Sequence, residues 1–138
     1  MGWLYNGQQF DPTDEFLDQY VGFVYLITDT ETGMKYIGKK LLWKIKRRPP
    51  LKGKKRRRSE KVQSDWRTYF SSSPTIQQLH EQHGDSRFKR EILMLCTSKG
   101  ECSYMEAKLQ FDHDVLRRPD FHNGIINCRI NRSHLRND

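Results

Sequence analysis

The sequence predicts an α+β fold in which helices pack against a small mixed or antiparallel sheet. Two observations predict this class. Three short runs, Val21–Thr28, Met34–Ile37 and Phe88–Cys96, are rich in the β-branched, aromatic and apolar residues typical of strands. The segments around them contain helix-start patterns and apolar residues at helical spacing. The length of 138 residues suits a single domain.

The first two runs are predicted to form a β-hairpin around which the chain is organised. Its loop, Asp29–Gly33, is polar and closes on a glycine, as hairpin loops often do. Each strand contributes one tyrosine, Tyr25 and Tyr36, among apolar neighbours. A buried tyrosine hydroxyl needs a hydrogen-bond partner, so these residues either fill a core or belong to a site.

The other elements follow from caps and breakers. Residues 1–10 are predicted to form an irregular arm, and Asp11 with Pro12 to start a two-turn helix with Asp11 as its N-cap. Residues 46–60 are predicted to form a flexible basic loop, because they contain a Pro-Pro pair. The elements predicted beyond this loop are a helix over Ser64–Phe70, a helix that starts at Pro74 with Ser73 as its N-cap and ends at Gly84, a central strand over Phe88–Cys96, a helix that opens with a capping box of Ser98 and Glu101 and runs to about Leu116, and a last strand over Ile125–Ile130.

One segment makes the chain basic. Lys44–Arg58 contains ten basic residues and no acidic ones, while the whole chain has a net charge of +8. Such a block binds polyanions by releasing their counterions, and a nuclear localisation signal at Lys54–Arg58 is the alternative. The sequence has no long apolar run and no signal-peptide pattern. Three cysteines without a Cys-x-x-Cys motif fit a reduced, cytoplasmic protein without a thiolate metal site.

The two tyrosines stand in a pattern that resembles the signature of the GIY-YIG nucleases. Residues 36–38, Tyr-Ile-Gly, match the second half as written. In the first half, Phe23 stands where a glycine is expected two residues before Tyr25, and Gly22 lies one residue earlier. The resemblance implies a three-stranded sheet flanked by helices. It also implies an arm and short helix over residues 1–20, a nuclease domain over 21–130 with a basic insertion at 41–64, and a tail over 131–138.

The resemblance implies a catalytic set of tyrosines and one glutamate. Tyr25 is expected to act as general base or to orient the attacking water, while Tyr36 and Tyr69 assist. Glu106 shares a side of its helix with apolar residues, where a carboxylate is costly unless it is paired or bound to metal. The resemblance makes it the ligand of one Mg²⁺ or Mn²⁺ ion. A boundary residue that reaches solvent is the alternative.

The resemblance also implies an asparagine and an arginine in the site. Asn127 is expected to be the asparagine that closes the site, with Asn123 as the second choice. The family's arginine would fall at Asp65, and an acid cannot stabilise phosphate charge. Arg67, or Arg58 from the basic loop, is therefore expected to take this role.

The expected function is metal-dependent hydrolysis of phosphodiester bonds in duplex DNA. The enzyme is expected to be a monomer or homodimer without a membrane partner, encoded by a phage or mobile element. One alternative is a catalytically degraded DNA- or RNA-binding protein on a nuclease-like scaffold, and another is a small regulatory protein that captures polyanions or acidic protein surfaces. The residues expected to contact DNA are Lys39, Lys40, Lys46, Arg47, Arg48, Lys54, Lys55, Arg56, Arg57 and Arg58.

Overall fold

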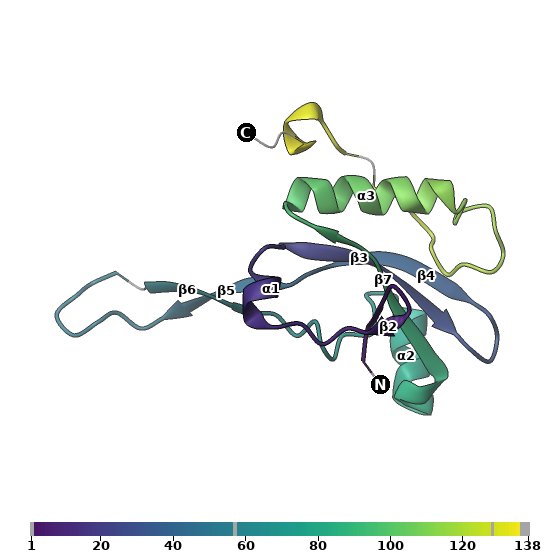
Figure 1. The fold of residues 1–138 in the computed structure, drawn as a ribbon, viewed down its shortest axis with the longest axis horizontal. Coiled ribbons are helices and arrows are strands. Elements are labelled where there is room, and N and C mark those ends of the chain that lie inside the picture. The colour runs from purple at the N-terminus through teal and green to yellow at the C-terminus, as the bar shows by residue number, and fades with distance from the viewer. Residues whose placement is uncertain (1, 57, 128, 136–138) are drawn as a thin grey trace.

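Three antiparallel strands form the centre of the main sheet. Strand β3 (Gly22–Asp29) pairs with β4 (Lys35–Leu41) on one side and with β7 (Phe88–Cys96) on the other. Two short strands, β1 (Leu4–Tyr5) and β2 (Gln8–Gln9), extend the sheet, and the order is β2-β1-β7-β3-β4 (Figure 1). The computed structural model describes residues 2–56, 58–127 and 129–135. The α+β prediction is confirmed, with two strands added to the three that the resemblance implied.

Helices cover the two faces of this sheet. Helix α3 (Lys99–Asp112) lies along one face, above the sheet in Figure 1, over a core that includes Val24 and Ile37. The opposite face carries a larger, aromatic core to which α1 (Asp14–Leu17) and α2 (Pro74–His83) contribute. The buried residues of this aromatic core are Trp3, Leu17, Phe23, Tyr25, Ile27, Leu42, Trp66, Phe70, Ile76, Phe88, Ile92 and Leu95.

A β-bulge lies beside Tyr25. In the pairing of β3 with β7, Val24 faces Met94 but Tyr25 faces Ile92, so Leu93 is an extra residue on β7. Bulges change the direction of side chains and are frequent next to active sites. Phe23, at the position where the signature has glycine, is fully buried beside Tyr25 in the aromatic core. This core has room for a large side chain, so the substitution leaves the strand intact.

The N-terminal segment differs from the irregular arm that was predicted for residues 1–10. It forms a small hairpin, β1 and β2, and β1 pairs in parallel with β7. Trp3 lies in the aromatic core with 1% of its surface exposed, and its indole Nε1 donates to the carbonyl of Trp66 at 2.7 Å. Helix α1 is one turn long, not two. Its N-cap is Thr13, not Asp11, and the Thr13 hydroxyl accepts from the backbone of Phe16.

The prediction of a flexible loop over residues 46–60 is wrong. Strands β5 (Trp43–Arg48) and β6 (Arg58–Gln63) pair as an antiparallel ribbon, called the basic ribbon below. The Pro-Pro pair ends β5 rather than interrupting it, since residues 49–50 directly follow the strand. Figure 1 shows the basic ribbon and its turn projecting away from the main sheet.

Two other predicted elements are absent from the described residues. Residues 64–70 make a single turn instead of a helix, because the buried Arg90 takes the carbonyls of Arg67 and Tyr69 and Ser71 has a φ of +91°. Residues 125–127 and 129–130 are not in a strand, since a side chain already occupies the edge of β4 at Ile37. Residue 128 lies outside the described residues.

The caps of the two longer helices are confirmed. Ser73 is the N-cap of α2, and Gly84 follows the helix with a φ of +80°. The Ser98 hydroxyl accepts from the backbone N–H of Glu101, while the Glu101 carboxylate accepts from the backbone of Thr97. Helix α3 ends at Asp112 rather than near residue 116. Among the described residues, no helix is long and apolar enough to span a membrane.

Candidate active site

Tyr25 lies at the centre of an aromatic cluster. Its ring is 6.3 Å from that of Tyr36 and 5.9 Å from that of Tyr69, measured between centroids. The side chain is fully buried, and its hydroxyl has no hydrogen-bond partner among the described residues. Burial raises the pKa of Tyr25 far above its ordinary value, and the neighbouring Tyr69 raises it further. The hydroxyl is therefore protonated at neutral pH and has an unused hydrogen-bonding capacity.

Gly38 makes room for Tyr25. The two residues face each other across β3 and β4. A Cβ at position 38 would lie 2.5 Å from the Tyr25 hydroxyl oxygen and 2.9 Å from Cε2 of Tyr36. Both distances are well below van der Waals contact. The glycine of the Tyr-Ile-Gly motif is thus required because both tyrosine rings pack directly on its backbone.

Tyr36 and Glu106 approach each other at the edge strand β4. Tyr36 is half-buried, and its hydroxyl hydrogen-bonds with Ser72 at 3.2 Å. Burial raises its pKa, and the nearby Glu106 carboxylate adds to the shift. Burial also raises the pKa of Glu106, while the charge and backbone N–H of Lys39 partly offset this. Helix α3 therefore delivers one partly desolvated carboxylate next to the tyrosine cluster.

The exposed edge of β4 is closed by two amide side chains. Asn123 is buried, accepts from the backbone N–H of Ile37 at 3.1 Å and donates to its carbonyl at 2.8 Å. Gln110 from α3 donates to the same carbonyl at 2.9 Å. These bonds imitate a neighbouring strand and fix the backbone between Tyr36 and Gly38. Asn127, by contrast, is exposed.

The segment that carries Tyr69 is held by a buried cation. The guanidinium of Arg90 on β7 donates to the carbonyl of Tyr69 at 2.7 Å and packs over the ring of Phe70 at 4.0 Å. Burial lowers the pKa of Arg90 to about 10, so the side chain stays charged at neutral pH. Ser71, at a φ of +91°, then turns the chain past Tyr25. Such strained residues are found at functional sites.

A second cation reaches the cluster from β4. The ammonium of Lys40 is 4.3 Å from the centroid of the Tyr69 ring and 2.6 Å from the carboxylate of Asp65. Lys40 lowers the pKa of Asp65 through this contact. Asp65 stands where the family's arginine was expected, and it is the ion-pair partner of Lys40. Arg67 instead stacks on Trp66 at 4.5 Å.

The other residues predicted to contact DNA fall into two groups. Lys39 lies on β4, and its ammonium donates to Ser103 on α3 at 2.6 Å, beside Glu106. The remaining described residues belong to the basic ribbon and its turn, and Arg57 lies outside the described residues. This second group consists of Lys46, Arg47, Arg48, Lys54, Lys55, Arg56 and Arg58.

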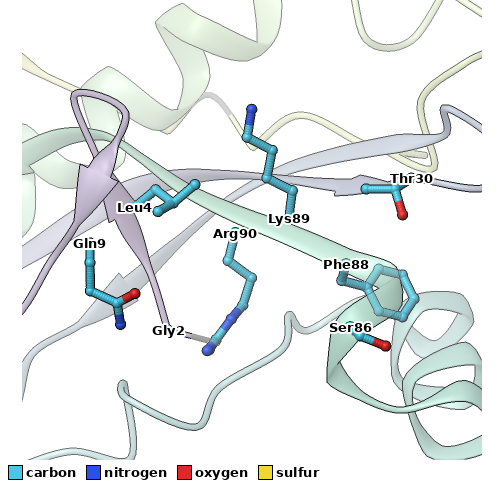
Figure 2. Close-up of a pocket in the computed structure, with 8 residues that line it drawn as sticks. All are labelled: Gly2, Leu4, Gln9, Thr30, Ser86, Phe88, Lys89 and Arg90. Atoms are coloured by element: carbon cyan, nitrogen blue, oxygen red, sulfur yellow. The ribbon is translucent and has the colours of Figure 1, made fainter.

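The sequence did not reveal that Arg90 and Lys40 both contact Tyr69. The alternation in β7 places Arg90 on the same face as Phe88, and an arginine on an apolar face was the available signal. Figure 2 shows Lys89 and Arg90 pointing to opposite sides of β7. Arg90 also lines a cavity of about 310 Å³ at the start of this strand. Neither Tyr25 nor Glu106 lines that cavity, so it is separate from the site.

The donor set at Glu106 suits one kind of metal ion. Among the described residues, no cluster of three or more His, Cys, Asp or Glu side chains could hold an ion. A single, partly desolvated carboxylate fits Mg²⁺ or Mn²⁺, since Mg²⁺ keeps several waters and binds through one carboxylate and substrate phosphates. The site does not fit zinc, which needs three or four side-chain ligands.

The comparisons agree with this geometry. Residues 3–126 match a family model described as "Putative endonuclease segE, GIY-YIG domain". The match covers most of the chain, which therefore belongs to the GIY-YIG nuclease family and contains an endonuclease domain of that type. No curated protein matches the chain, and no solved structure does.

Proposed function

We propose that this chain is a divalent-metal-dependent endonuclease that hydrolyses phosphodiester bonds in duplex DNA. The observation that carries the proposal is the packing of Tyr25 and Tyr36 on Gly38, with the Glu106 carboxylate near enough to Tyr36 to raise its pKa. Two hydroxyls and one carboxylate of this kind can bind a water molecule and a cation side by side. The membership of the GIY-YIG family supports the same reaction class.

The tyrosines act on the attacking water as hydrogen-bonding groups. Because burial raises the pKa of Tyr25 and of Tyr36, neither is a phenolate in the free protein at neutral pH. Of the two roles expected for Tyr25, orienting the water is therefore the better supported. Among the described residues its hydroxyl has no hydrogen-bond partner, and this unused capacity supports a contact with that water. Tyr36, which is less buried, is proposed to face the phosphate.

Glu106 is proposed to hold the metal ion, with Lys39 beside it. When bound, a divalent ion polarises the phosphate and stabilises the charge of the leaving oxygen. Glu106 itself must be ionised to do this, and the ammonium of Lys39 favours that form. Asn123 and Gln110 keep the β4 edge in place through their bonds to Ile37.

Lys40 is proposed to supply the positive charge expected from an arginine. Its ammonium lies against Tyr69 within the cluster, and Asp65 holds it there at 2.6 Å. The guanidinium of Arg67 is stacked on Trp66 and is 3.8 Å from Asp11. Arg58 pairs with Arg48 at the outer end of the basic ribbon, roughly 20 Å along the strand from its base. Lys40 is thus better placed than either arginine to contact a phosphate in the site.

The proposal is tested by plasmid cleavage. Supercoiled plasmid is incubated with the native protein at moderate salt, with Mg²⁺ or with EDTA, and separated on an agarose gel. The proposal predicts nicked or linear DNA with Mg²⁺ and intact DNA with EDTA. Cleavage in EDTA would refute the metal dependence. Retardation without cleavage under both conditions would support the DNA-binding alternative. Each chain offers one site, so we propose that a monomer nicks one strand and that cutting both strands takes two chains or two encounters.

A further inference from the structure

The basic ribbon is inserted between the two segments that form the site. Strand β5 begins at Trp43, shortly after Lys40, and β6 ends at Gln63, shortly before the turn that leads to Tyr69. At its base, Ser64 donates to the carbonyls of residues 41 and 42, at 2.6 and 2.8 Å. Whatever the ribbon binds is therefore positioned relative to Lys40 and Tyr69.

Contacts with Asp18 and Tyr20, which follow α1, fix the direction of the ribbon. The indole of Trp43 donates to the carbonyl of Tyr20 at 2.9 Å. From β6, Lys61 forms an ion pair with Asp18 at 2.7 Å and lies over the Trp43 ring. These contacts hold only the base. The six paired positions extend roughly 20 Å, so the outer part and the turn project from the body (Figure 1).

Both faces of the ribbon are cationic. Residues opposed across an antiparallel pair share a face. Lys44 and Lys46 lie on one face together with Arg58, while Arg47 and Lys61 lie on the other. A ribbon that rested flat on a phosphate backbone would need positive charge on one face only. Charge on both faces suits a ribbon with phosphates on both sides.

Most of these cations have no acidic partner. Within the basic ribbon and the described part of its turn, the ion pairs are those of Arg48 with Glu60 and of Lys61 with Asp18. Ile45, on the same face as Arg47, has 65% of its surface exposed. The described basic residues here without an ion pair are Lys44, Lys46, Arg47, Lys52, Lys54, Lys55, Arg56 and Arg58.

We propose that the basic ribbon enters the major groove of duplex DNA and contacts the phosphates of both groove walls. The inference rests on the proposed function, which makes duplex DNA the substrate. The major groove is about 12 Å wide and admits a two-stranded ribbon, whereas the minor groove, about 6 Å wide, does not. In this position one face of the ribbon, with Lys46, lies along one groove wall, and the other face, with Arg47, lies along the opposite wall.

The test measures binding separately from cleavage. The Kd of the native protein for a fluorescent duplex is measured by anisotropy in EDTA, with methyl green, which occupies the major groove, or netropsin, which occupies the minor groove. A variant with Lys46→Ser and Arg47→Ser removes one cation from each face. Its control, Lys108→Ser with Arg117→Ser, removes two exposed cations elsewhere. Circular dichroism confirms that both variants fold.

We expect methyl green to raise the Kd severalfold and netropsin to leave it unchanged. Each lost phosphate contact lowers the slope of log Kd against log salt by about 0.9, so the ribbon variant is expected to lower this slope by about 2. The control variant is expected to leave the slope unchanged. Methyl-green competition with no plasmid cleavage supports the ribbon proposal while the nuclease proposal fails. Cleavage by a protein that netropsin alone displaces, or an absence of duplex binding, overturns the ribbon proposal.

Discussion

Replacing Tyr25 by phenylalanine measures separately what its hydroxyl costs in folding free energy and what it contributes to cleavage. The hydroxyl is buried without a hydrogen-bond partner among the described residues, and an unsatisfied buried group costs about 1–3 kcal/mol of folding free energy. The hydroxyls of Ser71 and Tyr69 lie near enough to perturb its pKa and reduce that cost. We therefore expect Tyr25→Phe to stabilise the protein by about 1 kcal/mol, which raises the Tm by about 3 °C.

The same substitution is expected to lower the cleavage rate. A hydroxyl that orients the attacking water holds it in a reactive position, and loss of such positioning can cost about 100-fold, so plasmid cleavage under single-turnover conditions should fall by about that factor. Tm is measured by circular dichroism and cleavage by gel. Tyr104→Phe, on the exposed part of α3, is the matched control and should change neither quantity. A Tm lowered by several degrees would show that the Tyr25 hydroxyl stabilises the fold, and an unchanged cleavage rate would show that it takes no part in the reaction.

Three further predictions concern neighbouring residues. Gly38→Ala, whose Cβ would lie 2.5 Å from the Tyr25 hydroxyl oxygen, should lower Tm and abolish cleavage, whereas Gly124→Ala, which meets nothing within 4 Å, should do neither. Lys40→Met should lower the cleavage rate by about 100-fold with little change in DNA affinity, and Lys40→Arg should restore much of it; equal losses of cleavage and binding would contradict the catalytic role. Asp29 is held by Arg87, which lowers its pKa from 3.8 to about 2, so this pair contributes about 2 kcal/mol above pH 4 that is lost as the pH falls towards 2. Asp29→Asn should flatten the acid limb of stability against pH measured by urea unfolding, and an unchanged limb would show that other groups dominate.

The strands and caps were predictable because their determinants are local. The alternation in β7, the serine caps of α2 and α3 and the polar loop of the hairpin depend on neighbouring residues. The turn at Asp65–Thr68 was not predictable, since it depends on Arg90, more than twenty residues away. The basic ribbon was missed because ten basic residues with a Pro-Pro pair resemble a loop by composition, although its paired strands are held at the base by Trp43.

In the candidate site, too, residues that depend on local sequence were predictable and residues that depend on long-range contacts were not. Tyr25, Tyr36 and Glu106 could be proposed from the motif, and the structure brings them together. Which asparagine and which cation lie beside the tyrosines could not be predicted from the sequence. Asn123 pairs with the edge of β4, and Lys40 meets the acid at the expected arginine position, through contacts between residues far apart in the sequence.

Glu106 is proposed to be essential for cleavage and not for DNA binding. The most direct measurement compares native protein and Glu106→Gln in one experiment, with the single-turnover cleavage rate in Mg²⁺ and the Kd for the same DNA in EDTA. Glutamine keeps the shape of the side chain and removes its charge. We expect that cleavage is lost while the Kd is unchanged or slightly lower, because a negative charge near the phosphate is gone. Cleavage by Glu106→Gln at the native rate would show that the Glu106 carboxylate does not hold the metal ion.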